Sequence, residues 1–189
     1  MLVVGISGSP RRQASEFVLE EALNQLAEKG FETKLWTVRG KWLEFCTHCD
    51  YCLTNKVCSN QDDMEDIYAL LAQAKGILFA TPVYYGGVSA QTKTVMDRTR
   101  SLVAADKNFF KGKIGMGIAT GGDRAGGQEL ALWQIHTFFI INIPGIIDSI
   151  FITKSSKKRV CNSLTPTMMR IFSFEKRIFS IFNPYFAIR

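Results

Sequence analysis

The chain opens with the stretch Leu2-Val-Val-Gly-Ile-Ser-Gly-Ser-Pro-Arg-Arg-Gln-Ala-Ser15. Residues 2–6 are continuously apolar, which is typical of a strand buried on both faces. The polar residues 7–14 predict a turn. A helix should follow, because apolar residues from Phe17 to Leu26 share one helical face and Gly30 stands where a C-terminal cap is expected. The chain therefore begins with a strand, a turn and a helix.

The same alternation continues along the chain. Further strands are expected at residues 31–38, 76–80 and 113–119, and further helices at residues 62–74, 89–103 and 128–141. The helix at 62–74 is expected to start with a capping box, Asp62-Asp-Met-Glu65. Alternating strands and helices predict a doubly wound α/β fold with a parallel sheet in three α/β/α layers. Ligands should gather at the carboxyl ends of strands 2–6, 76–80 and 113–119.

Size and charge limit the possible functions. The chain has 189 residues, of which 47% are hydrophobic, and this fits one domain better than two. Its net charge of +6 comes from residues 153–189, because residues 1–152 hold 15 Lys and Arg against 16 Asp and Glu. No basic stripe alternates with aromatic residues in this first part, so we do not expect nucleic-acid binding.

The chain shows no sign of a targeting or membrane segment. Met1 leads directly into the first strand, without the basic and apolar regions of a signal peptide. The longest apolar run, residues 138–152, is interrupted and is shorter than the roughly 20 residues that a membrane span requires. We therefore expect a cytoplasmic protein without a transmembrane segment.

Residues 7–15 form a candidate phosphate-binding loop. Ser9, Arg11 and Ser15 supply hydroxyl groups and a positive charge at the start of the first helix. A helix N-terminus has unpaired N–H groups and a partial positive charge, so it can bind an anion. The loop lacks the G-x-G-x-x-G pattern of dinucleotide sites, which favours a mononucleotide. The alternative is a plain structural turn.

Two further loops could border a flat ring. Residues 81–89 place Tyr84 and Tyr85 beside two glycines, and residues 120–129 are rich in glycine. Glycine allows close approach of the backbone to a ring, and aromatic side chains can pack beside it. In the alternative interpretation the tyrosines cap the core and the second loop is a flexible surface segment. Because all three loops should meet at one edge of the sheet, a shared ligand is favoured.

Four of the five cysteines form the compact motif Cys46-x2-Cys49-x2-Cys52-x5-Cys58. Three thiolates at three-residue intervals and a fourth nearby can surround one iron–sulfur cluster. Zinc is the alternative, although zinc sites usually pair two cysteine knuckles across a longer spacer. Purely structural cysteines are disfavoured in such a polar segment. His48 is expected to be a solvated neighbour, and Cys161 stands apart.

Together these motifs resemble the iron–sulfur flavoproteins, a branch of the flavodoxin-like NAD(P)H-dependent FMN reductases. The resemblance covers about residues 2–141 and rests on Gly5-Ile-Ser-Gly-Ser-Pro-Arg11, the cysteine motif, Thr81-Pro-Val-Tyr-Tyr-Gly86, and Thr120-Gly-Gly with Gly127-Gln-Glu129. The resemblance implies a flavodoxin-like fold in which FMN and a [4Fe–4S] cluster exchange electrons. It further implies a homodimer or homotetramer, in which the cluster of one subunit lies near the flavin of another, and a donor such as ferredoxin or NAD(P)H.

The resemblance also implies the site residues. The FMN-binding residues are Ser9, Arg11, Ser15, Pro82, Val83, Tyr84, Tyr85, Gly86, Gly87, Gly121 and Gly122, and the cluster ligands are Cys46, Cys49, Cys52 and Cys58. Electron transfer needs no general base, so no catalytic acid, base or nucleophile is expected. The turn at Gln13-Ala14 is shorter than in relatives, which predicts an altered affinity for the phosphate.

The end of the chain departs from the family pattern. We expect a flavodoxin-like FMN-binding domain at residues 1–145, with the cysteine loop inserted at 46–58, and an atypical basic and aromatic segment at 146–189. After Gly145 there is no glycine and acidic residues almost vanish, so the sequence does not support the family's fifth strand and last helix. A frameshifted or divergent ending would explain this. A functional alternative is an amphipathic contact helix at residues 172–188.

Two other functions fit parts of the sequence. One is an NAD(P)H-dependent FMN or quinone reductase whose cysteines hold zinc or serve structure. The other is a redox-sensing interaction module that signals through the basic tail.

Overall fold

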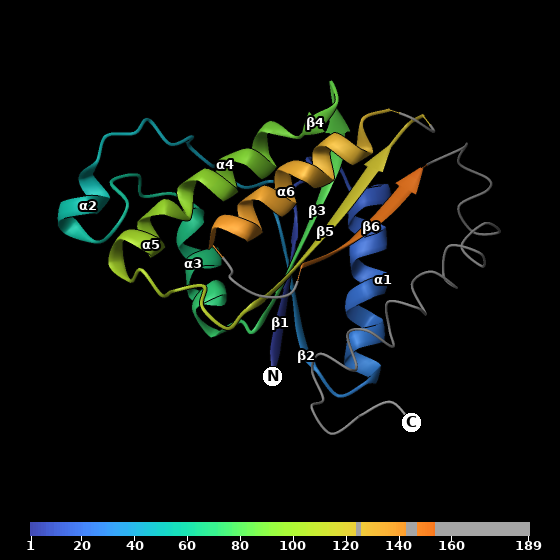
Figure 1. Cartoon of the computed structure of the whole chain (residues 1–189), viewed down its shortest axis with the longest axis horizontal. Coiled ribbons are helices and arrows are strands. Elements are labelled where there is room, and N and C mark those ends of the chain that lie inside the picture. Colours follow the sequence, from blue (N-terminus) through green and yellow to red (C-terminus); the bar gives the residue numbers. More distant parts are fainter. Residues whose placement is uncertain (124–125, 143–146, 154–189) are drawn as a thin grey trace. The chain divides into compact units, whose positions relative to one another are not determined.

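The computed structural model of the chain describes residues 1–123, 126–142 and 147–153. Five parallel strands in this part form a sheet in the order β2-β1-β3-β5-β6 (Figure 1). They are β1 Leu2–Ser7, β2 Glu32–Thr37, β3 Gly76–Tyr84, β5 Ile114–Gly121 and β6 Ile147–Thr153. The short strand β4, Gly87–Val88, pairs antiparallel with the end of β3. This topology confirms the predicted doubly wound, flavodoxin-like α/β fold.

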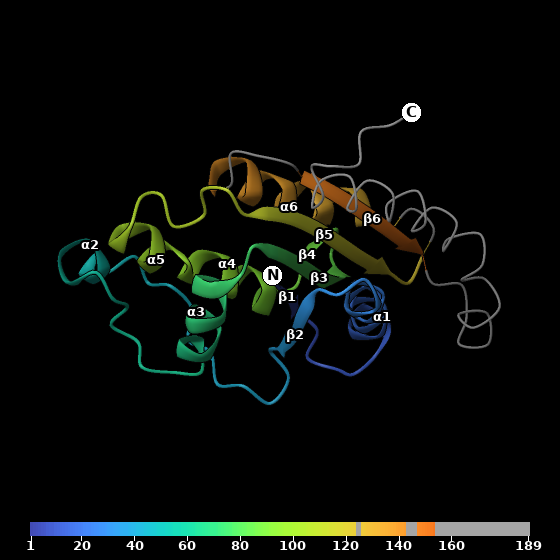
Figure 2. The ribbon, with the colours of Figure 1, turned by 90° about the horizontal axis from the view of Figure 1, so that it is seen from below.

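Helices cover both faces of the sheet. They are α1 Ala14–Glu28, α2 Tyr51–Asn55, α3 Met64–Gln73, α4 Ala90–Arg98, α5 Arg100–Ala105 and α6 Gln128–Asn142. Helix α1 lies on one face, where a Cβ atom at Gly5 would meet Leu19 and Leu23. Helices α3, α4 and α6 lie on the other face and share one apolar core with Val4 and Ile77 (Figure 2). The three predicted layers are therefore present.

Some elements differ from the expectations. The helix expected at 89–103 consists of α4 and α5, which are separated by a tight turn at Thr99. The short elements α2 and β4 had no sequence signal. The fifth strand, which the sequence left unsupported, is present as β6 and pairs with β5 from Gly115 opposite Ile147 to Gly121 opposite Thr153.

The atypical segment is described only as far as Thr153. By its contacts the chain divides into Met1–Thr153 and Lys154–Arg189, and the sheet and its covering helices belong to the first unit. Cys161 and the possible contact helix at 172–188 lie outside the described residues, and the domain boundary at residue 145 stays a prediction.

Within the described residues, no helix has both the length and the apolar character needed to cross a bilayer.

Two glycines in β5 allow α6 to approach the sheet closely. A Cβ atom at Gly115 would lie 2.5 Å from Cγ of Phe139, and a Cβ atom at Gly117 would lie 3.0 Å from Cδ2 of Leu132. The rings of Phe138 and Phe139 in turn contact Phe79 of β3, with centroid distances of 5.5 and 5.9 Å. Both positions are therefore glycine because a larger side chain would overlap α6.

We expect Gly115→Ala to lower the free energy of unfolding by about 1–3 kcal/mol, because the added methyl group overpacks the core against Phe139. Urea denaturation of the purified protein measures this change. Gly122→Ala is the matched control, since no atom lies within 4 Å of its Cβ position, and should change the free energy by less than about 0.5 kcal/mol. Equal effects of the two substitutions would show that close packing at Gly115 does not limit stability.

Candidate functional site

The three predicted ligand loops meet at the carboxyl edge of the sheet. They follow β1, β3 and β5, whose carboxyl ends lie at the top in Figure 1. The Ser15 and Thr120 hydroxyl groups are 2.6 Å apart and join the first loop to the end of β5. At Gly127, a Cβ atom would lie 2.5 Å from Cα of Gly86, so the second and third loops also touch. The structure therefore brings the three loops together.

A buried hydroxyl network fixes the first loop to the start of α4. Ser89 caps this helix by accepting a hydrogen bond from Thr92 N at 3.1 Å, and its Oγ donates to the Gly8 carbonyl at 2.6 Å. Thr81, Ser89 and Thr92 are fully buried. Gly8 needs to be glycine because a Cβ atom would overlap the Thr92 hydroxyl. Gly8 and Thr81 stand in the motifs quoted above and Ser89 at the start of the expected helix 89–103, but no sequence signal pointed to Thr92.

The predicted phosphate loop keeps its hydroxyl groups inside and its arginine outside. Ser9 Oγ donates to the Arg11 carbonyl at 2.6 Å and accepts from Arg11 N at 3.2 Å, while Arg11 itself is exposed. The N-cap residue of α1 is Gln13, whose side chain makes no capping hydrogen bond. The first N–H groups of α1 thus have no side-chain cap, and a phosphate could accept from them.

The second loop presents its tyrosines to solvent. Pro82 and Val83 are half-buried, but Tyr84 is 39% exposed and Tyr85 is fully exposed. Tyr85 and Gly86 have φ values of +48° and +75°, which form the tight turn between β3 and β4. The alternative that these tyrosines cap the core is therefore wrong. Beyond the turn, Val88 N donates to Oε1 of Gln134 on α6 at 3.0 Å.

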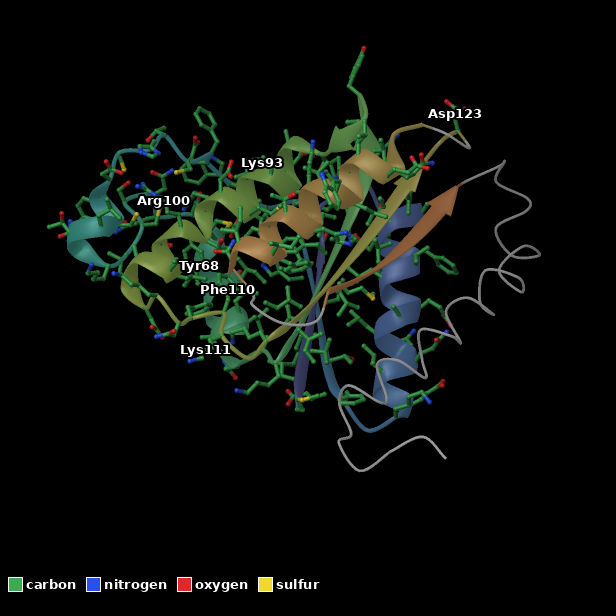
Figure 3. The ribbon with its side chains drawn as sticks, viewed as in Figure 1. Tyr68, Lys93, Arg100, Phe110, Lys111 and Asp123 are labelled. Carbon is green, nitrogen blue, oxygen red and sulfur yellow. The ribbon has the colours of Figure 1, made fainter. Side chains whose placement is uncertain are left out.

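The third loop is shaped by one buried glutamine. Gln128 Nε2 donates to the Asp123 carbonyl at 2.6 Å, and its Oε1 accepts from Gly126 N at 2.9 Å. Gly121 is buried against the same side chain, whereas Gly122 is exposed. Asp123, labelled in Figure 3, stands where this loop leaves β5. The described ends of the loop are thus held by specific hydrogen bonds at the edge of the sheet.

A second site lies beside α4 and α5. All four cysteines of the motif are free thiols and line one pocket. The wall on the α4 and α5 side includes Asp97, Arg98, Arg100 and Ser101. Arg100, labelled in Figure 3, extends from α5 toward the cysteine loop, where its Nη2 binds Asp50 at 2.7 Å. The four predicted ligands are therefore gathered in space as well as in sequence.

The backbone of the cysteine loop is tightly wound. His48, Asp50 and Lys56 have φ values of +56°, +59° and +63°, which non-glycine residues rarely adopt. Asp50 and Lys56 flank α2 on its two sides. A left-handed residue next to a right-handed one can turn successive N–H groups toward one side, an arrangement found at phosphate and iron–sulfur sites. Such conformations cost about 1–3 kcal/mol each and gather at functional sites. The His48 imidazole is largely exposed, 3.6 Å from Asp50.

Hydrogen bonds favour the thiolate form at Cys49. Its Sγ lies 3.4 Å from Ser59 Oγ. This contact, together with the backbone N–H of Tyr51, lowers the pKa of Cys49 below its usual value of 9.0. Thiolates are the form in which cysteine binds metals.

The donor set fits a cluster. Among the described residues, no group of three or more His, Cys, Asp or Glu side chains is arranged to hold a metal ion. Four cysteine thiolates can bind either a tetrahedral zinc ion or an iron–sulfur cluster, so this finding does not choose between the two. Four thiols around one pocket beside two arginines match an anionic cluster of this kind.

A buried ion pair holds the cysteine loop against α4. Both guanidinium Nη atoms of Arg98 bind the Asp62 carboxylate, at 2.7 and 3.0 Å, and both side chains are almost completely buried. Burial raises the pKa of Asp62, but hydrogen bonds from Arg98 and from the backbone N–H groups of Glu44 and Met64 outweigh it and hold the pKa below 3.8. The expected capping box at Asp62 is therefore wrong, since the N-cap is Asp63 and Asp62 binds Arg98.

Helix α4 connects the two sites. It begins after Ser89, which binds the first loop, and ends at Arg98 in the wall of the cysteine pocket. Its nine residues span about 13 Å at 1.5 Å per residue. A rigid element of known length thus separates the candidate flavin edge from the candidate cluster.

The chain is similar to known flavin proteins. Residues 1–156 match the family of NADPH-dependent FMN reductases. An iron–sulfur flavoprotein of Archaeoglobus fulgidus is 66% identical over 141 residues, which are 75% of this chain and 72% of that protein. An iron–sulfur flavoprotein of Methanosarcina thermophila is 39% identical over 149 residues, which are 78% and 76% of the two chains.

The fold has solved relatives as well. The apo form of the NADH:FMN oxidoreductase EMOB superposes with a TM-score of 0.62 at 22% identity, over 89% of this chain and 87% of that chain. This likeness shows the fold, while the sequence matches show the family. The protein is therefore a flavin-dependent oxidoreductase that belongs to the iron–sulfur flavoprotein family, within the NADPH-dependent FMN reductases.

Proposed function

We propose that the protein binds FMN at the carboxyl edge of the sheet and a [4Fe–4S] cluster through Cys46, Cys49, Cys52 and Cys58, and that it transfers electrons between a donor and FMN. The observation that carries this proposal is that all four cysteines line one pocket. The iron–sulfur flavoproteins to which the chain is similar support the pairing of the two cofactors. When bound, FMN supplies the conversion between one-electron and two-electron chemistry.

Each of the three loops would contact a different part of FMN. Ser9, Arg11 and Ser15 would hold the phosphate at the start of α1, where helix N–H groups favour an anion. Residues 82–87 would border the ring, since Tyr84 and Tyr85 are exposed beside the glycine turn. Gly121 and Gly122 would close the site from the third loop. No side chain is assigned as a catalytic acid, base or nucleophile.

We further propose a homodimer or homotetramer, a donor such as ferredoxin or NAD(P)H, and a cytoplasmic location. These proposals rest on the family resemblance and on the composition of the chain. The main alternative is an NAD(P)H-dependent FMN or quinone reductase with zinc or structural cysteines. The match to the NADPH-dependent FMN reductases fits this alternative as well as the proposed function.

Protein purified without oxygen should contain FMN and about four iron and four sulfide per chain. Replacing any one of Cys46, Cys49, Cys52 or Cys58 by serine should remove most of the iron and sulfide and leave FMN bound, because the flavin edge lies at the other end of α4. Elemental analysis, sulfide determination and heat release of the flavin measure these contents. Cys161→Ser is the control and should keep the full iron content.

Two results would count against this proposal. Zinc without sulfide would favour the reductase alternative. Full iron content in the serine variants would show that these cysteines are not the ligands.

Arg11→Gln should weaken FMN binding about tenfold, because it removes one charge-assisted hydrogen bond to the phosphate. Riboflavin lacks the phosphate, so its affinity should not change. Fluorescence titration of the flavin-free protein measures both dissociation constants. Arg12→Gln is the matched control: Arg12 is also exposed, but its Nη2 binds Glu20 at 3.3 Å, and its loss should leave both affinities unchanged. Equal weakening of both flavins by Arg11→Gln would place Arg11 outside the phosphate site.

A further inference from the structure

We infer that Arg98 and Asp62 are positioning residues that clamp the two ends of the cysteine loop and preset the four thiols for the cluster. This inference rests on the proposed function, because it concerns how the cluster is received.

The clamp joins both ends of the loop to one side chain. Arg98 Nη1 donates to the Glu44 carbonyl at 2.6 Å, at the start of the loop. Arg98 Nη2 donates to the Asn60 carbonyl at 3.2 Å, at the end of the loop. All four cysteines lie between these two carbonyl groups in the sequence. One guanidinium therefore closes the segment that carries every proposed ligand.

Asp62 completes the closure from the other side. Its Oδ2 accepts from Glu44 N at 2.8 Å as well as from Arg98, and its Oδ1 accepts from Met64 N at 3.1 Å. The carboxylate thus ties the start of the loop to the start of α3. Because it bonds both to the backbone and to the guanidinium, neither end of the loop can move away without breaking several partly buried hydrogen bonds.

The clamp is anchored in the rigid part of the fold. Arg98 is the last residue of α4, and its side chain is completely buried. Its own carbonyl accepts from Tyr68 Oη at 3.0 Å and from Ser101 Oγ at 3.1 Å. Tyr68, labelled in Figure 3, belongs to α3. The loop is therefore held to α3, α4 and α5 at once.

A loop that is already ordered lowers the entropic cost of cluster binding. Ordering a flexible loop costs conformational entropy, and without the clamp the free energy of cluster binding would have to offset that cost. The wall of the cysteine pocket includes Arg98, so the same side chain that closes the loop also lines the site. Arginine suits this role because each of its two Nη atoms bonds two oxygens, one from the loop backbone and one from the Asp62 carboxylate. A lysine ammonium lacks this planar fork.

Two variants test the clamp. Arg98→Lys keeps the charge and loses the fork, and Asp62→Asn keeps the shape and loses the charge. In each we expect a chelator to remove the cluster 10–100-fold faster than from wild type, as for other groups that orient metal ligands. In the protein freed of cluster, hydrogen exchange should speed up at residues 45–59 and stay unchanged in α1 and β5. FMN affinity should also stay at the wild-type value.

Arg12→Gln is the matched control. Arg12 is also an arginine that pairs with an acidic residue, Glu20, but at the surface and outside the wall of the cysteine pocket. Its loss should change neither the rate of cluster loss nor the exchange of residues 45–59.

The outcomes separate the clamp from the proposed function. Wild-type rates of cluster loss and of exchange in both variants would overturn the clamp. Faster exchange throughout α1 and β5 would also overturn it, because the pair would then only stabilise the fold. If wild type takes up FMN but no cluster, the proposed function fails, and exchange at residues 45–59 of Asp62→Asn still decides whether the pair closes the loop.

Discussion

The buried pair of Arg98 and Asp62 is the interaction on which the second site depends. The cysteine loop contributes no strand to the sheet, and its two ends meet at this guanidinium and carboxylate. A buried pair of this kind gives little net stability, and the loss of one partner leaves a buried charge unpaired. We propose that it nevertheless specifies one arrangement of the loop, and with it the position of the four thiols relative to α4.

The first site depends on the sheet itself. A parallel doubly wound sheet brings the ends of β1, β3 and β5 to one edge, where their loops must share space. Buried hydroxyl groups then lock these loops together, through Ser15 with Thr120 and through Ser89 with Gly8. Helix α4 starts at this edge and ends at the cysteine pocket, so the fold and the clamp together fix both sites on one rigid element.

Much of this arrangement could be predicted from the sequence. Hydrophobic periodicity and the glycine-rich turns indicated β1, β2, β3 and β5 and the loops at the edge, and the cysteine spacing indicated the second site. The clamp could not be predicted, because Arg98 and Asp62 are 36 residues apart and each fits a local role, in a helix and in a capping box. The break at Thr99 and the strand β6 depend on tertiary packing, which overrides local composition.

Electron exchange between the two cofactors is the central claim, and transient kinetics test it most directly. Oxidised protein is mixed anaerobically with a reduced one-electron donor such as a ferredoxin, and the bleaching of the flavin is followed in wild type and in Cys52→Ser. We predict rapid flavin reduction in wild type and a loss of at least tenfold in rate in the variant, with FMN still bound. Equal rates in the two proteins would show that electrons reach the flavin without the cysteine site, and would contradict the account.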